Sequence, residues 1–213
     1  MKKEIKAVIF EKDGVLTGSE GFNVRSAEEA FKQRGIRKKE IFGRHQEGHK
    51  KYFLKKYNSS YQKYRQIQTP FSFKFYGSAK LNKFIISLIK RLHKREIRLA
   101  LTIIFELERI LNLLKRLNLG GVFEVLVTSE DTGNRKSAPD QYLKTLKSPL
   151  IFAKECVALD DSPAGVQAVK AAKINCVSFK THYVRRKDLI KVDVSLSEKS
   201  IMSSLKKVGV KIK

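Results

Sequence analysis

Residues 6–20 read KAVIFEKDGVLTGSE, and this stretch decides the fold. It carries most of a short apolar run over residues 5–10, which is followed at once by two acids, Glu11 and Asp13. A run of this length and composition is typical of a strand buried on both faces of a parallel sheet. Polar residues directly after such a strand lie at the carboxyl edge of the sheet, where open α/β sheets bind their ligands.

Four further apolar runs of the same kind follow along the chain, over residues 97–102, 123–128, 156–160 and 174–179. Helical spacing of apolar residues lies between them, over residues 81–92 and 105–117, and Ser162-Pro163 is typical of a helix start. Strands that alternate with helices predict an α/β fold with right-handed crossovers. We therefore expect a Rossmann-like, doubly wound parallel sheet.

The segment after the first strand breaks this alternation. It predicts helices over residues 25–34 and 39–57, and then an aromatic and basic stretch that ends at Thr69-Pro70. An insertion that leaves the carboxyl edge of a sheet is placed to form a lid over the site there. We expect a small α-helical domain over residues 19–80, inserted into an α/β core formed by residues 1–18 and 81–213. The end of the chain, residues 203–213, shows no long apolar pattern.

The positive charge is concentrated in two segments. The formal net charge of the 213 residues is +24, yet residues 1–20 and 101–170 are each neutral, with 4 basic and 4 acidic side chains in the first and 9 of each in the second. The excess lies in residues 21–100 (+16) and 171–213 (+8). Such an excess predicts attraction to an anionic partner.

Several classes of protein are excluded by the composition. The sequence contains no run of about 18 apolar residues, which is the length that a membrane-spanning helix needs. The N-terminus lacks the pattern of a secretory signal. The two cysteines, Cys156 and Cys176, lie in apolar runs and are interpreted as reduced thiols. We expect a cytoplasmic protein without a membrane partner.

Polar side chains gather at the ends of the predicted strands. They are Glu11 and Asp13 after the first, Thr102 at the second, Lys136 after the third, and Asp160 and Asp161 after the fourth. Four carboxylates in one pocket need a cation, and oxygen ligands suit Mg²⁺. A lysine and a hydroxyl beside a metal suit a phosphoryl group.

These motifs resemble those of the haloacid dehalogenase-like superfamily. The stretch at residues 6–20 resembles its first motif, and the others follow in order as Ala100-Leu-Thr102, Lys136-Ser-Ala-Pro-Asp140 and Val157-Ala-Leu-Asp-Asp-Ser-Pro-Ala-Gly-Val166. The resemblance covers nearly the whole chain. It is strongest to the branch with a helical cap, which contains β-phosphoglucomutase and phosphoglycolate phosphatase-like proteins, and residues 21–79 take the place of the cap.

The resemblance implies a role for each motif residue. In the family the first carboxylate, here Glu11, attacks phosphorus, and the second, here Asp13, protonates the leaving group and then activates water. Thr102 and Lys136 would hold the phosphoryl group as the remaining catalytic residues. Glu11, Asp13, Asp160 and Asp161 would form the Mg²⁺ site, with Asp161 as a direct ligand.

The chain departs from the family at its first catalytic position. The family nucleophile is aspartate, and Glu11 is one methylene longer. A displacement of about 1 Å in an in-line attack can cost roughly 100-fold in rate. Two departures are smaller: Ile103-Ile104 follow Thr102 where the family usually has a polar or small residue, and Ser137 replaces the usual proline after the lysine. We therefore expect a Mg²⁺-dependent phosphohydrolase or phosphomutase-type protein that acts on a small phosphorylated metabolite, with weakened activity.

A second function stays open from the sequence. Lysines and arginines interleave with tyrosines and phenylalanines over residues 50–75, and such a pattern can bind nucleic acid through phosphate contacts and base stacking. The chain would then be a catalytically degenerate scaffold that binds nucleic acid or a ribonucleoprotein. The simpler interpretation is that the aromatic residues form the small core of the lid and the lysines its solvated face.

Overall fold

The computed structural model describes residues 4–33, 35, 46–58, 60–76, 81–103, 107–132, 136–147, 152–179, 193–195 and 198–212. The chain divides into two compact units, with boundaries between Leu16 and Thr17 and between Leu81 and Asn82. The larger, which we call the core unit, contains the sheet. The second contains residues 17–81, and its described part is mainly helical. A lid function for the second unit stays a prediction.

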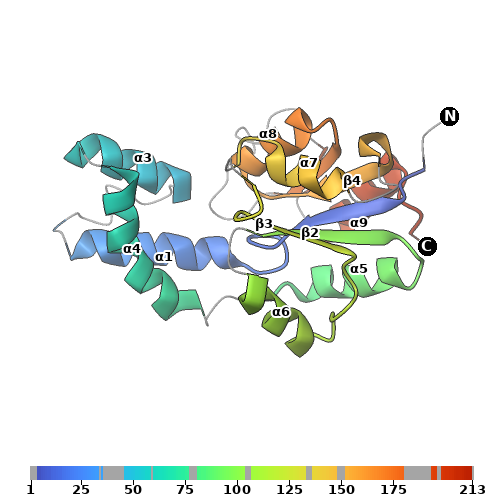
Figure 1. Cartoon of the computed structure of the whole chain (residues 1–213), viewed down its shortest axis with the longest axis horizontal. Coiled ribbons are helices and arrows are strands. Elements are labelled where there is room, and N and C mark those ends of the chain that lie inside the picture. The colour runs from blue at the N-terminus through green and yellow to red at the C-terminus, as the bar shows by residue number, and fades with distance from the viewer. Residues whose placement is uncertain are drawn as a thin grey trace. The chain divides into compact units, whose positions relative to one another are not determined.

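The core unit is built on a parallel sheet of six strands in the described residues (Figure 1), with the order β3-β2-β1-β4-β5-β6. This is a doubly wound order, so the predicted α/β class is confirmed. Each of the five predicted strands is present. The strands are β1 (Ala7–Glu11), β2 (Arg98–Ile103), β3 (Val125–Thr128), β4 (Cys156–Leu159), β5 (Asn175–Phe179) and β6 (Asp193–Ser195).

Helices cover both faces of the sheet. Figure 1 shows α7 and α8 on one face and α5 and α6 on the other. No helix in the described residues is both long and apolar enough to cross a membrane. The helices of the core unit are α5 (Lys83–His93), α6 (Leu107–Arg116), α7 (Asp140–Leu146), α8 (Pro163–Ala171) and α9 (Glu198–Val208), with a short 3₁₀ turn η1 (Ala153–Glu155) before β4.

Side-chain caps fix where two of these helices begin. The Asn82 side chain accepts a hydrogen bond from the backbone N–H of Ile85 at 3.2 Å, so α5 begins at Lys83 rather than at the predicted residue 81. Ser162 caps α8 in the same way, with the N–H of Gly165 as donor at 2.9 Å. The predicted helix start at Ser162-Pro163 is therefore confirmed.

The end of the chain contains a helix that the sequence analysis did not predict. Residues 198–208 form α9, and Ile201 and Leu205 on this helix are buried in the main core with Val210 and Ile212. The sequence analysis did not predict α9, because the window of residues 203–213 begins in the middle of this helix and leaves out Ile201. The strand β6 was missed because three residues at a sheet edge carry no apolar run.

The second unit consists of α1 (Ser19–Lys32), α3 (Gln46–Tyr57) and α4 (Tyr61–Tyr76) in its described part. The expected end at Thr69-Pro70 was wrong, because α4 continues through Pro70. A proline inside a helix removes one backbone hydrogen bond. Packing of α4 along α1 offsets that cost, and it includes a buried hydrogen bond from Gln68 Nε2 to Ser26 Oγ of 3.0 Å.

Aromatic side chains form the core of this second unit. Phe31, Phe53 and Tyr64 are buried together, and the rings of Phe31 and Phe53 stack with centroids 5.5 Å apart. Lys55 and Lys63 are exposed on the same helices. For these described residues, the aromatic side chains belong to a core and the lysines to a solvated face. Nucleic-acid binding stays a prediction that this packing does not favour.

Candidate active site

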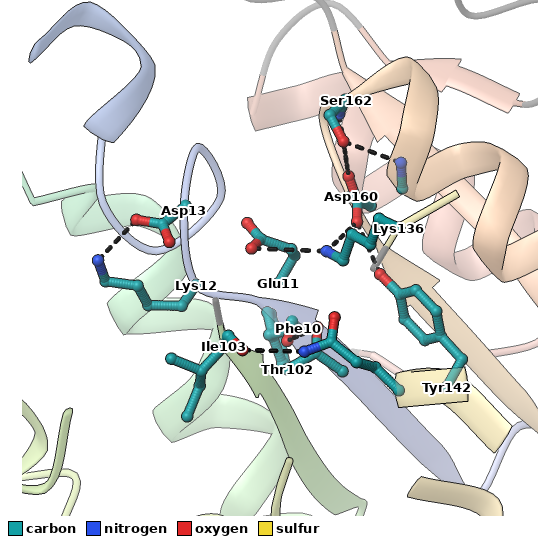
Figure 2. Close-up of polar contacts among 12 residues, drawn as sticks. Phe10, Glu11, Lys12, Asp13, Thr102, Ile103, Lys136, Tyr142, Asp160 and Ser162 are labelled. Carbon is teal, nitrogen blue, oxygen red and sulfur yellow. Dashed lines mark hydrogen bonds and ion pairs between the residues drawn. The ribbon is translucent and has the colours of Figure 1, made fainter. Parts of the chain in front are cut away.

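The site lies where the strand order of the sheet reverses. β1 pairs with β2 on one side and with β4 on the other, and the carboxyl ends of such central strands form the crevice that binds ligands in this architecture. Glu11 is the last residue of β1, and Asp160 follows β4 directly. Figure 2 shows the side chains of Glu11, Lys136 and Asp160 pointing toward one another.

Lys136 joins the acids of the two strands. Its Nζ lies 2.8 Å from Asp160 Oδ2 and 3.5 Å from Glu11 Oε1 (Figure 2). Burial alone would lower the pKa of Lys136, but Asp160 and Glu11 beside it raise that pKa above its ordinary value. Lys136 is therefore a permanent cation between two carboxyl groups, and the sequence prediction that these three residues converge is confirmed by their contacts.

Asp160 is the most heavily hydrogen-bonded of the acids. Its Oδ2 accepts from Lys136 Nζ at 2.8 Å and from the hydroxyl of Tyr142 at 2.7 Å. Its Oδ1 accepts from the backbone N–H and the hydroxyl of Ser162, both at 2.9 Å. The side chain is fully buried, and Gly165 packs so closely on it that a Cβ there would overlap the carboxylate. These four donors match the usual acceptor capacity of a carboxylate.

Tyr142 is a site residue that the sequence analysis missed. It lies on α7, is fully buried, and presents its ring to Lys136 Nζ at 5.4 Å from the centroid. Burial, and then the negative Asp160, raise the pKa of its hydroxyl well above the ordinary value, so it stays a donor. The sequence analysis missed Tyr142 because an aromatic residue on a helix is normally interpreted as part of the hydrophobic core. Its position near the start of the helix that follows Lys136 was the one sequence feature that could have indicated a role in the site.

Glu11 occupies an unusual environment for a carboxyl group. Its side chain is 2 % exposed, and neither Oε1 nor Oε2 has a hydrogen-bond partner among the described residues. Burial raises the pKa of Glu11 well above its ordinary value, and Lys136 offsets only part of that rise. Two buried oxygens without donors mark a place where a further positive charge would stabilise the carboxylate.

Asp13 is paired with its own neighbour in sequence. The Nζ of Lys12 lies 2.6 Å from Asp13 Oδ1, while Asp13 Oδ2 is buried without a hydrogen-bond partner in the described part of the chain. Lys12 is itself only 1 % exposed. The sequence analysis did not single out this lysine, because its burial depends on the turn that follows β1.

That turn also lies close to Asp161, an acid of the fourth motif. Gly14 has φ +94°, a conformation that only glycine adopts without strain, and a Cβ there would overlap the carboxylate of Asp161. Asp161 therefore lies against the backbone that follows Asp13. The prediction that Asp161 lies close to the first motif is confirmed.

Thr102 is placed differently from the other predicted residues. It pairs with Glu11 across the sheet, but its hydroxyl donates a long hydrogen bond of 3.4 Å to the carbonyl of Phe10. The side chain is fully buried. Its contacts with β1 are structural, and its role in holding a phosphoryl group stays a prediction.

The donor set has the chemistry that Mg²⁺ prefers, although it is not a complete cage. In the described residues, no three His, Cys, Asp or Glu side chains are gathered closely enough to hold a metal by themselves. Both oxygens of Asp160 already accept hydrogen bonds, from Lys136, Tyr142 and Ser162. One oxygen of Asp13 accepts a hydrogen bond from Lys12. Mg²⁺ usually keeps several waters and is bound through one or two carboxylates and the phosphate of the substrate. The oxygens of Glu11 and Asp13 without hydrogen-bond partners fit that mode.

Comparison with known proteins identifies a matching family and several relatives. Residues 8–179 match the family model described as haloacid dehalogenase-like hydrolase. The chain is 25% identical over 202 residues to Protein SUPPRESSOR OF QUENCHING 1, chloroplastic, of Arabidopsis thaliana, a match that covers 84% of this chain and 18% of that protein. It is 29% identical over 103 residues to Phosphorylated carbohydrates phosphatase of Thermotoga maritima. That match covers 48% of this chain and 48% of that protein. The chain thus matches less than half the length of these two curated relatives.

Solved structures share the fold. The crystal structure of β-phosphoglucomutase from Clostridium difficile superposes with a TM-score of 0.69 at 19% identity, and the match covers 95% of this chain and 98% of that one. At this identity the likeness establishes the fold and not the substrate. The predicted resemblance to proteins of the β-phosphoglucomutase kind is confirmed at that level.

Proposed function

The chain belongs to the haloacid dehalogenase-like hydrolase family, and from this premise we propose that it is a Mg²⁺-dependent phosphohydrolase or phosphomutase-type protein for a small phosphorylated metabolite. We propose further that Glu11 in place of the family's aspartate limits its turnover. One observation carries the proposal. Lys136, a buried cation, lies between the carboxyl groups of Glu11 and Asp160 at the point where the strand order reverses.

The proposed chemistry takes place in two steps. An Oε of Glu11 attacks phosphorus, the bond from phosphorus to the ester oxygen breaks, and Asp13 gives its proton to the leaving oxygen. Water then attacks the phosphorus of the glutamyl phosphate and loses its proton to Asp13, which releases phosphate and restores Glu11. In a mutase, a sugar hydroxyl takes the place of that water.

Other side chains position the reacting groups. Lys136 would contact the oxygens of the phosphoryl group and stabilise their negative charge. Asp160 and Tyr142 fix the ammonium group and so act through Lys136. Glu11, Asp13 and Asp161 would hold Mg²⁺, which supplies positive charge beside the phosphoryl oxygens when it is bound.

The proposed substrate class is a phosphorylated sugar. The support is the name of one relative, Phosphorylated carbohydrates phosphatase, together with the family match. We also propose a cytoplasmic location. Its support is the pair of free and buried thiols, Cys156 and Cys176, which is typical of reducing compartments.

Phosphate release from a panel of sugar phosphates, measured with Mg²⁺ and with EDTA, tests the function. We expect slow release that requires Mg²⁺ and is lost in Asp13→Asn, because the leaving group then receives no proton. The matched control is Asp131→Asn, which changes an acid on the loop after β3 without touching the site. Release that is equal in EDTA, or that persists in Asp13→Asn, would contradict the proposal.

A further inference from the structure

Helix α5 carries positive charge along one side. Lys83, Lys90, Arg91 and Lys94 are exposed, and helical spacing places them on the same side of α5. We call these four residues the α5 basic face. The opposite side of the helix is buried in the main core through Ile85, Leu88, Ile89 and Leu92. The α5 basic face therefore points away from the sheet that α5 covers (Figure 1).

Acidic side chains do little to neutralise this face. Residues 81–103 hold six lysines and arginines against one acid, Glu96. Two acids near the amino ends of the strands are already paired elsewhere. Glu155 lies 3.1 Å from Lys6, and Glu124 lies 2.7 Å from Arg98. Most of the charge on the α5 basic face is therefore available to an anionic partner.

The stability of the helix accounts for only part of this charge. Cations in the last turn of a helix interact favourably with its dipole, and Lys90 and Arg91 are placed there. Lys83 is the first residue of α5, where a cation is unfavourable by the same rule. The charge at that end is not explained by the stability of the helix.

The shape of the face favours the backbone of a nucleic-acid duplex. The helix rises about 16 Å from Lys83 to Lys94, and each strand of a duplex carries one phosphate per roughly 3.4 Å. The four residues include no aromatic ring, and Phe84 on the same helix packs against the core. Single strands are bound largely through stacking on aromatic rings, whereas cations alone can bind the phosphates of a duplex.

An anionic membrane fits this face less well. A helix that lies in a membrane interface buries its apolar side among the lipids. The apolar side of α5 is already buried in the main core. Charge alone would have to hold the chain at a lipid surface, without an apolar anchor from this helix.

We propose that the α5 basic face binds the phosphate backbone of double-stranded nucleic acid without regard to sequence. This function goes beyond the proposed phosphate release. The surface belongs to the core unit and differs from the basic and aromatic stretch over residues 50–75. None of its four residues is a residue of the active site, so the two functions can be tested separately.

The experiment is a titration of a labelled duplex of about 20 base pairs with the full chain, followed by fluorescence anisotropy between about 50 and 200 mM salt. Each phosphate contact adds about 0.9 to the slope of log affinity against log salt. The triple variant Lys83→Gln/Lys90→Gln/Lys94→Gln removes three cations. We expect its slope to be smaller by about 2.7 and its affinity at about 50 mM salt to be at least about tenfold lower.

Two matched variants assign this loss to the α5 basic face. Arginine at the same three positions keeps the charge and should keep the affinity. Lys199→Gln/Lys206→Gln/Lys207→Gln removes equal charge from exposed positions on α9, and its slope should change by less than about 0.9. If the α5 triple variant does not fold, Lys90→Gln alone should lower the slope by about 0.9.

Several results would overturn the inference. They are absent duplex binding by the unchanged chain, an equal loss in the α9 variant, tighter binding to single strands, and binding to phosphatidylserine vesicles in place of the duplex. Duplexes of unrelated sequence should bind equally, and a strong preference among them would also contradict it. Duplex binding through α5 by a chain that releases no phosphate would support this inference and contradict the proposed function alone.

Discussion

Replacing Glu11 with aspartate is expected to raise the rate of phosphate release about 100-fold. The aspartate shortens the side chain by one methylene and returns the attacking oxygen by about 1 Å toward the in-line position that the family uses. The measurement is kcat/KM for a sugar phosphate at saturating Mg²⁺, with the unchanged chain beside the variant.

Two matched variants test whether the increase in rate depends on the carboxylate at residue 11 and on Asp13. Glu11→Gln has the size of the native side chain and no nucleophile, so its rate should fall to background. Glu11→Asp/Asp13→Asn should lose the gain. If Glu11→Asp is folded and no faster than the unchanged chain, the length of the side chain is not what limits turnover.

Replacing Asp160 with alanine is expected to lower the free energy of unfolding by about 3–5 kcal/mol. The change leaves the ammonium of Lys136 and the hydroxyl of Tyr142 buried without their shared acceptor. It also removes the acceptor of Ser162 at the start of α8. Guanidinium unfolding in EDTA measures the effect without a metal contribution.

The comparison variants assign the loss to this network. Tyr142→Phe removes one hydrogen bond to a charged group and should cost about 1.5–3 kcal/mol. Glu155→Ala breaks the surface ion pair with Lys6 and should cost less than about 1 kcal/mol. An Asp160→Ala loss no larger than that of Glu155→Ala would show that the buried ion pair contributes little to stability.

The sheet could be predicted from the sequence because its central strands are buried on both faces. The run around Val8 and Phe10, both fully buried, has no polar alternation that could be mistaken for a surface strand. The edge strand β6 gave no such signal. α9 was missed because its burial depends on contacts with elements far along the chain, as Ile201 and Leu205 show.

The site could be predicted in outline for a related reason. Residues at the ends of adjacent parallel strands must meet, so Glu11 and Asp160 were brought together by topology alone. Lys12 and Tyr142 could not be found in this way. A lysine normally reads as exposed and a tyrosine on a helix as core, and only the folded chain shows that both bond to acids of the site.

The most direct test of the central claim asks whether residue 11 receives the phosphoryl group. Glu11→Asp/Asp13→Asn is mixed with p-nitrophenyl phosphate, whose leaving group needs no proton, quenched in acid, and digested for mass spectrometry. Without the base at residue 13 the acyl phosphate should persist, so we predict one phosphoryl group on the peptide that contains residue 11. Release of p-nitrophenol with no phosphoryl group on that peptide would contradict the account.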